Sequence, residues 1–341
     1  MDSGRFAESQ KTGGASNADH AVQGTSNDAA VSRESAARLG YIEDPFIGYF
    51  VRPPQRRAPL INRGTFCRFH GVQNAMCQFA QALNATSSAP SLPDAAGPGQ
   101  IVVLGAGFDT SYFILEREGL GVGRFFEIDF AEITAKKAAT IYRHQPLKSL
   151  LPKDTKVALG GSELHSSRYS LISGDLREFR SQIVPKLVEN GFDCSQPTLF
   201  LSECVLIYLD PQYSDEIIDW VTEAVANAAI LTYEQIRPDD RFGQMMIENL
   251  RARQLELRGL HAHPTLESTS HRFLTRGWHA STAIDLADYH DRCIDDAERA
   301  RLASLEFLDE WEEFTLLAQH YAFTFAHSKD AEPFSMLNPL Q

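Results

Sequence analysis

Short apolar runs recur along the middle of the chain, separated by polar turns. The first, residues 101–104, has four consecutive apolar side chains and leads into a Gly-x-Gly turn. Such a run is typical of a strand buried on both faces of a parallel sheet. The pattern predicts strands at 101–104, 125–129, 169–173, 198–203, 228–233 and 320–326, with helices between them, for example at 130–143 and 211–226. This alternation indicates an α/β fold with a doubly wound, mostly parallel sheet.

The beginning of the chain lacks this pattern. Residues 1–30 are rich in small and polar residues and contain almost no large apolar ones. Such a segment cannot bury enough surface to offset its ordering entropy, which predicts a disordered tail. We therefore expect removal of residues 1–25 to leave stability and activity nearly unchanged. A single domain is expected over residues 31–341.

Three further segments are expected within that domain. Residues 31–83 have the composition and apolar spacing of an N-terminal helical portion. Residues 84–100 are rich in Pro, Ser, Ala and Gly, which is typical of a flexible insertion. Residues 237–300 interrupt the strand–helix alternation with a charged, helical pattern. We interpret them as an added helical lid over the carboxyl edge of the sheet, where α/β folds bind ligands.

Composition and charge exclude several classes of protein. The chain has 341 residues, 43% of them hydrophobic, with no apolar run of membrane-spanning length and no signal-peptide core. We therefore expect a cytoplasmic monomer, with the nucleus as a second compartment. Its five cysteines form no CxxC pair, so we predict neither a metal site nor a disulfide framework. The net charge of −13 argues against nucleic acid as a partner.

The turn after the first predicted strand suggests a nucleotide pocket. Gly105 and Gly107 allow a sharp turn and a close approach of the backbone to a ligand. Asp129 ends the second predicted strand, where a carboxylate can accept hydrogen bonds from a ribose diol. A dinucleotide fingerprint would have its third glycine where this chain has Asp109-Thr110. An acid there repels a pyrophosphate but suits an ammonium group. This favours S-adenosylmethionine, and a nicotinamide-dependent dehydrogenase is the alternative.

Two further acids are expected at the same edge of the sheet, because Asp175 follows the third predicted strand and Glu203 ends the fourth. Ribose hydroxyls, an adenine amino group and an ammonium are all donors, and carboxylates accept from each. One such acid alone is typical of a helix cap or a solvated loop. Their convergence favours a binding site. A cofactor carboxylate would also need a cation, for which Arg63 and Arg68 are the candidates.

Longer motifs then connect the chain with a known family. They are Ile61-Asn62-Arg63-Gly64, Arg68-Phe69-His70-Gly71-Val72, Leu104-Gly105-Ala106-Gly107-Phe108-Asp109-Thr110, Phe126-Glu127-Ile128-Asp129-Phe130, Asp175-Leu176-Arg177, Ser202-Glu203-Cys204-Val205-Leu206-Ile207-Tyr208, Tyr233-Glu234-Gln235, Asp240-Arg241-Phe242-Gly243-Gln244 and Ser304-Leu305-Glu306-Phe307-Leu308-Asp309-Glu310. With these motifs, residues 31–326 resemble the leucine carboxyl methyltransferases. The resemblance implies a class I S-adenosylmethionine-dependent methyltransferase fold. It also implies methyl esterification of the C-terminal leucine α-carboxylate of the protein phosphatase 2A catalytic subunit.

The resemblance further implies roles for individual residues. The cofactor-binding residues would be Arg68 at the methionyl carboxylate, Gly105 in the turn, Asp129 at the ribose, Asp175 and Leu176 beside adenine, and Glu203 near the methionyl group. Arg33 stands where the family has a lysine, so its contact with the cofactor is left open. A related branch of the family acts on a modified guanosine in transfer RNA through a chain with a long propeller extension, which we do not expect here.

The expected reaction is a direct in-line displacement. A C-terminal carboxylate is ionised at pH 7, so the reaction needs no general base, and we expect no catalytic histidine. Arg68 and Tyr208 would position the reacting groups, while Tyr233, Gln235 and the arginines between 237 and 258 are candidates for substrate contacts. The alternatives are a small-molecule carboxyl O-methyltransferase and a non-catalytic, chaperone-like protein that binds the phosphatase on the same fold.

Overall fold

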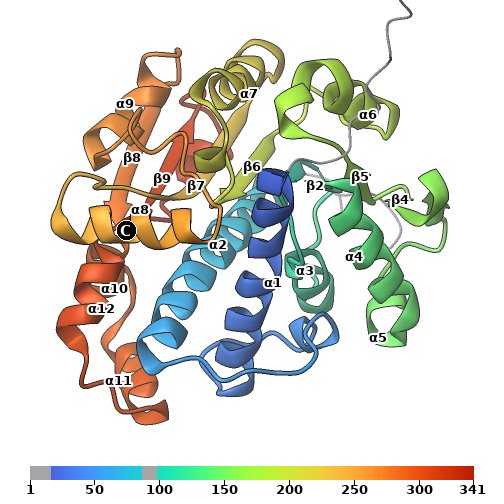
Figure 1. Ribbon diagram of the computed structural model, residues 1–341. Coiled ribbons are helices and arrows are strands. Elements are labelled where there is room, and N and C mark those ends of the chain that lie inside the picture. The colour runs from blue at the N-terminus through green and yellow to red at the C-terminus, as the bar shows by residue number, and fades with distance from the viewer. Residues whose placement is uncertain (1–16, 87–97) are drawn as a thin grey trace, which may run out of the picture.

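A mixed sheet forms the centre of the computed structural model, which describes residues 17–86 and 98–341 (Figure 1). Within these residues the sheet has nine strands in the order β3-β4-β5-β2-β1-β6-β7-β9-β8. The five strands in the middle of that order, β5 to β7, are mutually parallel, and β9 returns antiparallel to β7. Their bounds are β1 Gln100–Leu104, β2 Arg124–Asp129, β5 Tyr169–Ser173, β6 Thr198–Glu203, β7 Ala228–Gln235 and β9 Tyr321–His327. The predicted doubly wound, mostly parallel α/β fold is confirmed.

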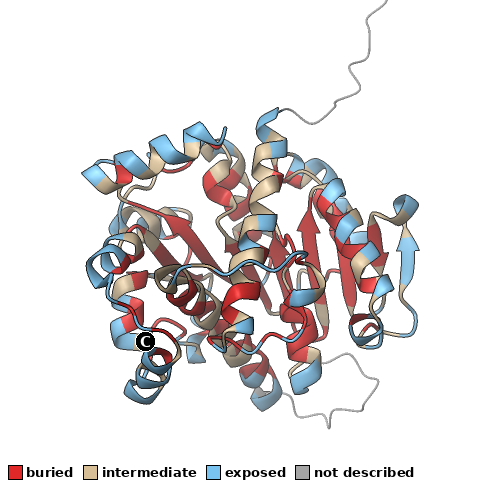
Figure 2. Cartoon of the chain, turned by 60° about the horizontal axis from the view of Figure 1, so that its bottom comes forward, coloured by how far each residue is buried: buried red, intermediate tan, exposed pale blue. Residues whose placement is uncertain are grey.

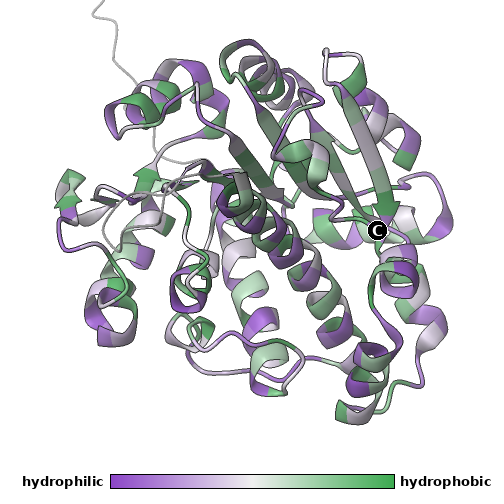
Figure 3. Ribbon diagram, turned by 180° about the vertical axis from the view of Figure 1, so that it is seen from behind, coloured by the Kyte–Doolittle hydropathy of each residue, from purple (hydrophilic) through white to green (hydrophobic). Residues whose placement is uncertain are grey.

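Helices cover both faces of this sheet. Alternate residues of β1 enter opposite cores: Ile101 and Val103 join one, Val102 and Leu104 the other. Figures 2 and 3 show the buried, hydrophobic strands between helices whose outer surfaces are exposed and polar. In the described part of the chain the α-helices are α1 Asn17–Arg38, α2 Pro59–Thr86, α3 Ser111–Glu118, α4 Ala131–Arg143, α5 Gln145–Lys148, α6 Val184–Glu189, α7 Pro211–Ala224, α8 Arg241–Ala252, α9 Leu266–Leu274, α10 Leu286–Cys293, α11 Asp296–Leu305 and α12 Trp311–Ala318. None of them is long and apolar enough to cross a membrane.

The predicted disordered tail is wrong for residues 17–30. Helix α1 begins at Asn17, whereas residues 1–16 lie outside the described residues. The first half of α1 has no large apolar stripe, and Gln23 is its single buried residue before Ala30. Contacts with distant parts of the chain hold it instead, among them an ion pair of 3.1 Å between Asp19 and Arg177. Composition alone cannot predict such contacts, because they join residues far apart in the sequence.

Two other segments also differ from expectation. Helix α2 continues to Thr86 and β1 begins at Gln100, so both ends of the predicted insertion are regular structure; residues 87–97 lie outside the described residues. The predicted helical lid contains a strand, β8 (Ala280–Asp285), which pairs antiparallel with β9. Its small and polar residues lack an apolar alternation, because β8 is a half-exposed edge strand. The short strands β3 (Lys156–Ala158) and β4 (Glu163–His165) were missed for lack of length.

Candidate active site

A cavity of about 910 Å³ lies at the carboxyl edge of the parallel strands. The ends of β1, β2, β5, β6 and β7 contribute to its wall, and helices α1, α2, α8 and α12 complete it. Every site residue assigned from the sequence lines this one cavity: Arg33, Arg68, Gly105, Asp129, Asp175, Leu176, Glu203, Tyr208, Tyr233 and Gln235. Arg63 does not line it, because its buried guanidinium packs 5.2 Å from the ring of Trp311. Of the two arginines considered for a cofactor carboxylate, Arg68 is therefore the one that lines the cavity.

The glycine turn after β1 forms the floor of the cavity. Gly105 and Gly107 have φ values of +64° and +50°, which are in the left-handed region that L side chains disfavour. A Cβ atom on Gly105 would lie 2.5 Å from the side chain of Val205. The backbone and the packing therefore both require glycine at position 105, and the turn presents free backbone rather than side chains to a ligand.

Asp129 is oriented by that turn. Its two carboxylate oxygens accept hydrogen bonds from the backbone N–H groups of Gly107 (2.6 Å) and Phe130 (2.7 Å). Burial raises the pKa of Asp129 to about 6, although these hydrogen bonds oppose the shift. Beneath it lies a fully buried ion pair of 2.5 Å between Lys137 and Glu127. A carboxylate oxygen has more than one acceptor site, so Asp129 can still accept hydrogen bonds from a ligand diol.

Arg68 and Glu203 form an ion pair at the centre of the cavity. The Nε atom of Arg68 lies 2.7 Å from the Glu203 carboxylate, and the guanidinium lies 5.2 Å from the ring centroid of Tyr233. Burial disfavours the charged form of Arg68, but Glu203 outweighs it and raises the arginine pKa. The pair fixes both side chains. Nε donates to the Glu203 carboxylate and Nη2 donates one hydrogen to the Glu203 carbonyl oxygen at 3.4 Å. Three of the five N–H donors of the guanidinium therefore remain for a bound carboxylate.

Glu234, to which no role was assigned from the sequence, fixes the loop that follows Glu203. Its buried carboxylate accepts hydrogen bonds from the N–H groups of Leu206 (3.1 Å) and Val205 (3.3 Å). Burial raises the pKa of Glu234 to about 7. The side chain thereby holds the segment that carries Glu203 and packs Val205 against the glycine turn. Its place beside Tyr233 and Gln235 in one motif is the signal that could have indicated it.

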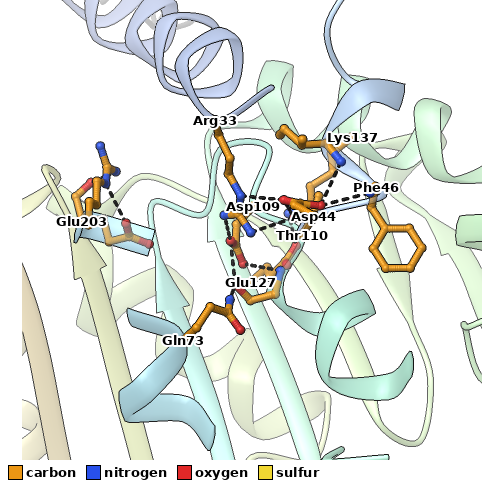
Figure 4. Close-up of polar contacts among 12 residues, drawn as sticks. Arg33, Asp44, Phe46, Gln73, Asp109, Thr110, Glu127, Lys137 and Glu203 are labelled. Carbon is orange, nitrogen blue, oxygen red and sulfur yellow. Dashed lines mark hydrogen bonds and ion pairs between the residues drawn. The ribbon is translucent and has the colours of Figure 1, made fainter. Parts of the chain in front are cut away.

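Arg33 connects α1 with the glycine turn (Figure 4). Its guanidinium lies 2.6 Å from Asp44 and 2.7 Å from Asp109, and it donates to the Thr110 hydroxyl at 2.8 Å. Burial opposes ionisation of Asp109, but Arg33 outweighs it and lowers the pKa of this carboxyl. Arg33 is engaged with protein partners on both sides. The structure thus places this residue at the cavity as the link that holds α1 in position.

The residues assigned to adenine from the sequence line the cavity at the end of β5. Asp175 follows β5, accepts the N–H of Arg177 at 2.9 Å and pairs with its guanidinium at 2.5 Å. Leu176 is buried beside it. Arg177 also pairs with Asp19 of α1. The first half of α1 therefore reaches the rim of the cavity next to Asp175.

An apolar lobe extends the cavity beyond Arg68 and Glu203, and sequence analysis missed it. Leu286, Phe314, Leu317, Ala318 and Tyr321 line this lobe. They come from α10, α12 and β9, which only the tertiary fold brings to the strand ends. The rings of Tyr233 and Tyr321 stack there with their centroids 5.3 Å apart. At the mouth lie Arg251, Arg253 and Arg258 of the predicted arginine cluster; Arg241 is not part of the cavity wall.

Comparison with known proteins assigns the chain that forms this cavity to a family. The family model of the leucine carboxyl methyltransferases matches residues 21–222. The chain is 39% identical over 310 residues to a leucine carboxyl methyltransferase 1 homolog from Arabidopsis thaliana, covering 90% of this chain and 89% of the relative. Leucine carboxyl methyltransferase 1 from Rattus norvegicus is 37% identical, with 90% of each chain covered. The chain belongs to the leucine carboxyl methyltransferase family.

One further relative and one solved structure add to this result. The tRNA wybutosine-synthesizing protein 4 of Homo sapiens is 35% identical over 94% of this chain, which spans 46% of that protein. Among solved structures, a DUF574 family protein from Streptomyces avermitilis shares the fold with a TM-score of 0.53 at 12% identity, over 87% of this chain and 97% of that one. Family membership makes the chain a methyltransferase and supports carboxyl methylation. The matched region of the leucine carboxyl methyltransferase family begins at residue 21, within α1.

Proposed function

We propose that this protein transfers a methyl group from S-adenosylmethionine to the α-carboxylate of a C-terminal leucine, in the catalytic subunit of protein phosphatase 2A. The single observation that carries the proposal is the composition of the cavity. One end holds the glycine turn and the acids, the other end is apolar, and Arg68 lies between them. The names of the relatives that align over most of both chains support a leucine carboxyl group as the methyl acceptor.

The cofactor end fits S-adenosylmethionine by its donor and acceptor set. Asp129 is held by the turn with acceptor sites to spare, and no side chain at Gly105 obstructs the floor. Glu203 suits an ammonium group, and Arg68 suits a carboxylate. When bound, this cofactor supplies an electrophilic methyl group on a sulfonium. The chain's own task is to hold the acceptor oxygen in line with that group and to exclude water.

No proton has to be removed from the acceptor. An α-carboxyl group has an ordinary pKa of about 3.5, so it is ionised at neutral pH and a carboxylate oxygen can bond to the methyl carbon as the carbon–sulfur bond breaks. Tyr208 and Tyr233 are available to orient the carboxylate, and the apolar lobe at Leu317 suits a leucine side chain.

A panel of methyl acceptors tests this proposal. Labelled methyl transfer would be measured to the phosphatase catalytic subunit, to the same subunit without its terminal leucine, to N-acetyl-leucine and to total transfer RNA. We expect transfer to the intact subunit alone. Transfer to N-acetyl-leucine at an equal rate would favour a small-molecule enzyme, and transfer to RNA would favour the activity of the wybutosine branch. Binding to the phosphatase without any transfer would favour the chaperone-like alternative.

A further inference from the structure

The first half of α1 spans the cofactor end of the cavity. Its N-terminal side is tied to the end of β5 through Asp19 and Arg177. Ser26 faces the turn after β1, where a Cβ atom on Gly107 would lie 3.4 Å from it. Strand β2 lies between β5 and β1 in the sheet. Helix α1 therefore crosses the strand ends in the order β5, β2, β1 and then reaches Asp109 through Arg33.

Gln23 occupies the middle of this crossing. With a rise of 1.5 Å per residue, it lies about 6 Å along the helix axis from Asp19 and about 4.5 Å from Ser26. That position is over the end of β2, where Asp129 is found. The side chain is 7% exposed and belongs to the cavity wall. Its amide Nε2 has no hydrogen-bond partner in the described structure.

An amide donor buried without a partner is unusual, since buried polar groups in folded proteins are nearly always hydrogen-bonded. The first half of α1 also has little core of its own, because Gln23 is the single buried residue from Asn17 to Ala29 and itself lines the cavity. Ion pairs at the rim hold it, from Asp19 to Arg177 and from Asp28 to Arg253. A ligand in the cavity would supply both the missing acceptor and the missing contacts.

We propose that Gln23 binds the adenosine part of the cofactor. Its Nε2–H donates to an acceptor there, a ribose oxygen or a purine ring nitrogen, from the side opposite to Asp129. The first half of α1 then closes over the bound nucleoside. This inference rests on the proposed use of S-adenosylmethionine, but it assigns a binding residue in a segment whose composition predicted disorder.

Titration calorimetry of the full-length protein with S-adenosylhomocysteine tests the role of Gln23. Gln23→Leu keeps the approximate size and removes the amide, and Asn27→Leu is the matched control at an exposed position of α1 that does not line the cavity. We expect Gln23→Leu to weaken binding about tenfold or more, as for an unmade hydrogen bond, and the control to bind like the wild type. Equal affinity of all three proteins would overturn the assignment. Should Gln23→Leu fail to fold, Gln23→Ala takes its place.

Hydrogen–deuterium exchange of the wild type tests the closing of α1 independently of any variant. We expect the backbone amides of residues 18–29 to exchange more slowly when S-adenosylhomocysteine is present, while those of the exposed helix α11 stay unchanged. Equal exchange of residues 18–29 with and without the ligand would overturn the closing role. If the wild type bound neither S-adenosylmethionine nor S-adenosylhomocysteine, both the proposed function and the role of Gln23 would fail. If the wild type bound S-adenosylhomocysteine and Gln23→Leu bound it equally well, only the role of Gln23 would fail.

Discussion

Replacement of Asp129 by asparagine should make the ligand-free protein more stable at neutral pH while it weakens cofactor binding. The pKa of this buried carboxyl is about 6, against 3.8 in an unfolded chain. Between these values the folded protein holds a proton at Asp129 that the unfolded chain has lost, so stability falls as pH rises from about 4 to about 6 and stays low above. Relative to its stability below about pH 3, the protein thus loses about 1 kcal/mol at pH 4.5, where Asp129 is still protonated in the folded state, and about 3 kcal/mol at pH 7.5, where Asp129 is ionised.

The asparagine side chain removes this cost but introduces a smaller one. Its oxygen can accept from one of the N–H groups of Gly107 and Phe130, and its own amide then faces the other, which costs about 1–2 kcal/mol. The variant should therefore be no more stable than the wild type at pH 4.5, and about 1–2 kcal/mol more stable at pH 7.5. A gain of that size at pH 7.5 raises the melting temperature by a few degrees.

Thermal melting at both pH values measures this difference, with Glu132→Gln as the control for loss of one carboxylate at an exposed position. Calorimetry at pH 7.5 should show S-adenosylmethionine binding to Asp129→Asn weakened about tenfold or more, because a ribose acceptor is lost. A stability difference that does not change with pH would refute the argument that burial destabilises the ionised carboxylate. Unchanged affinity would remove Asp129 from the cofactor site.

The geometry of the cavity leads to three further predictions. Arg68→Lys keeps the charge but loses the guanidinium fork beside Glu203, so the KM for S-adenosylmethionine should rise about tenfold while the melting temperature stays within a few degrees; an unchanged KM contradicts a direct role. Deletion of residues 1–25 removes Asp19 and Gln23, so cofactor affinity should fall at least tenfold, and wild-type affinity would mean that α1 is dispensable. Leu317→Glu should abolish methylation of the leucine-terminated phosphatase but leave S-adenosylhomocysteine affinity intact, and loss of both would show that the variant disturbs more than the apolar lobe.

The strands and the acids that follow them were predictable because both signals are local. A buried parallel strand has a continuous apolar run, and the carboxyl ends of such strands meet at one edge, so the sequence is enough to expect Asp129, Asp175 and Glu203 together. The edge strand β8 lacks that run. Its pairing with β9 depends on residues about forty positions later in the chain.

The rest of the cavity depends on contacts that no local pattern encodes. Helix α1 has too few apolar residues to predict order, and it is held by Asp19, Asp28 and Arg33 against partners far along the chain. The apolar lobe at Phe314 and Leu317 is built from helices that follow the central strands by many residues. The spacing of apolar residues in these helices indicates ordinary packed helices. Only the tertiary fold turns one side of them toward a ligand.

The most direct test of the central claim is the mass of the phosphatase catalytic subunit after incubation with this protein and S-adenosylmethionine. The account predicts that its C-terminal peptide gains the mass of one methyl ester at the leucine α-carboxyl, that alkali removes this gain, and that Arg68→Ala fails to produce it. A methyl group found on any other residue, or a C-terminal peptide of unchanged mass under conditions where the cofactor is bound, would contradict the account.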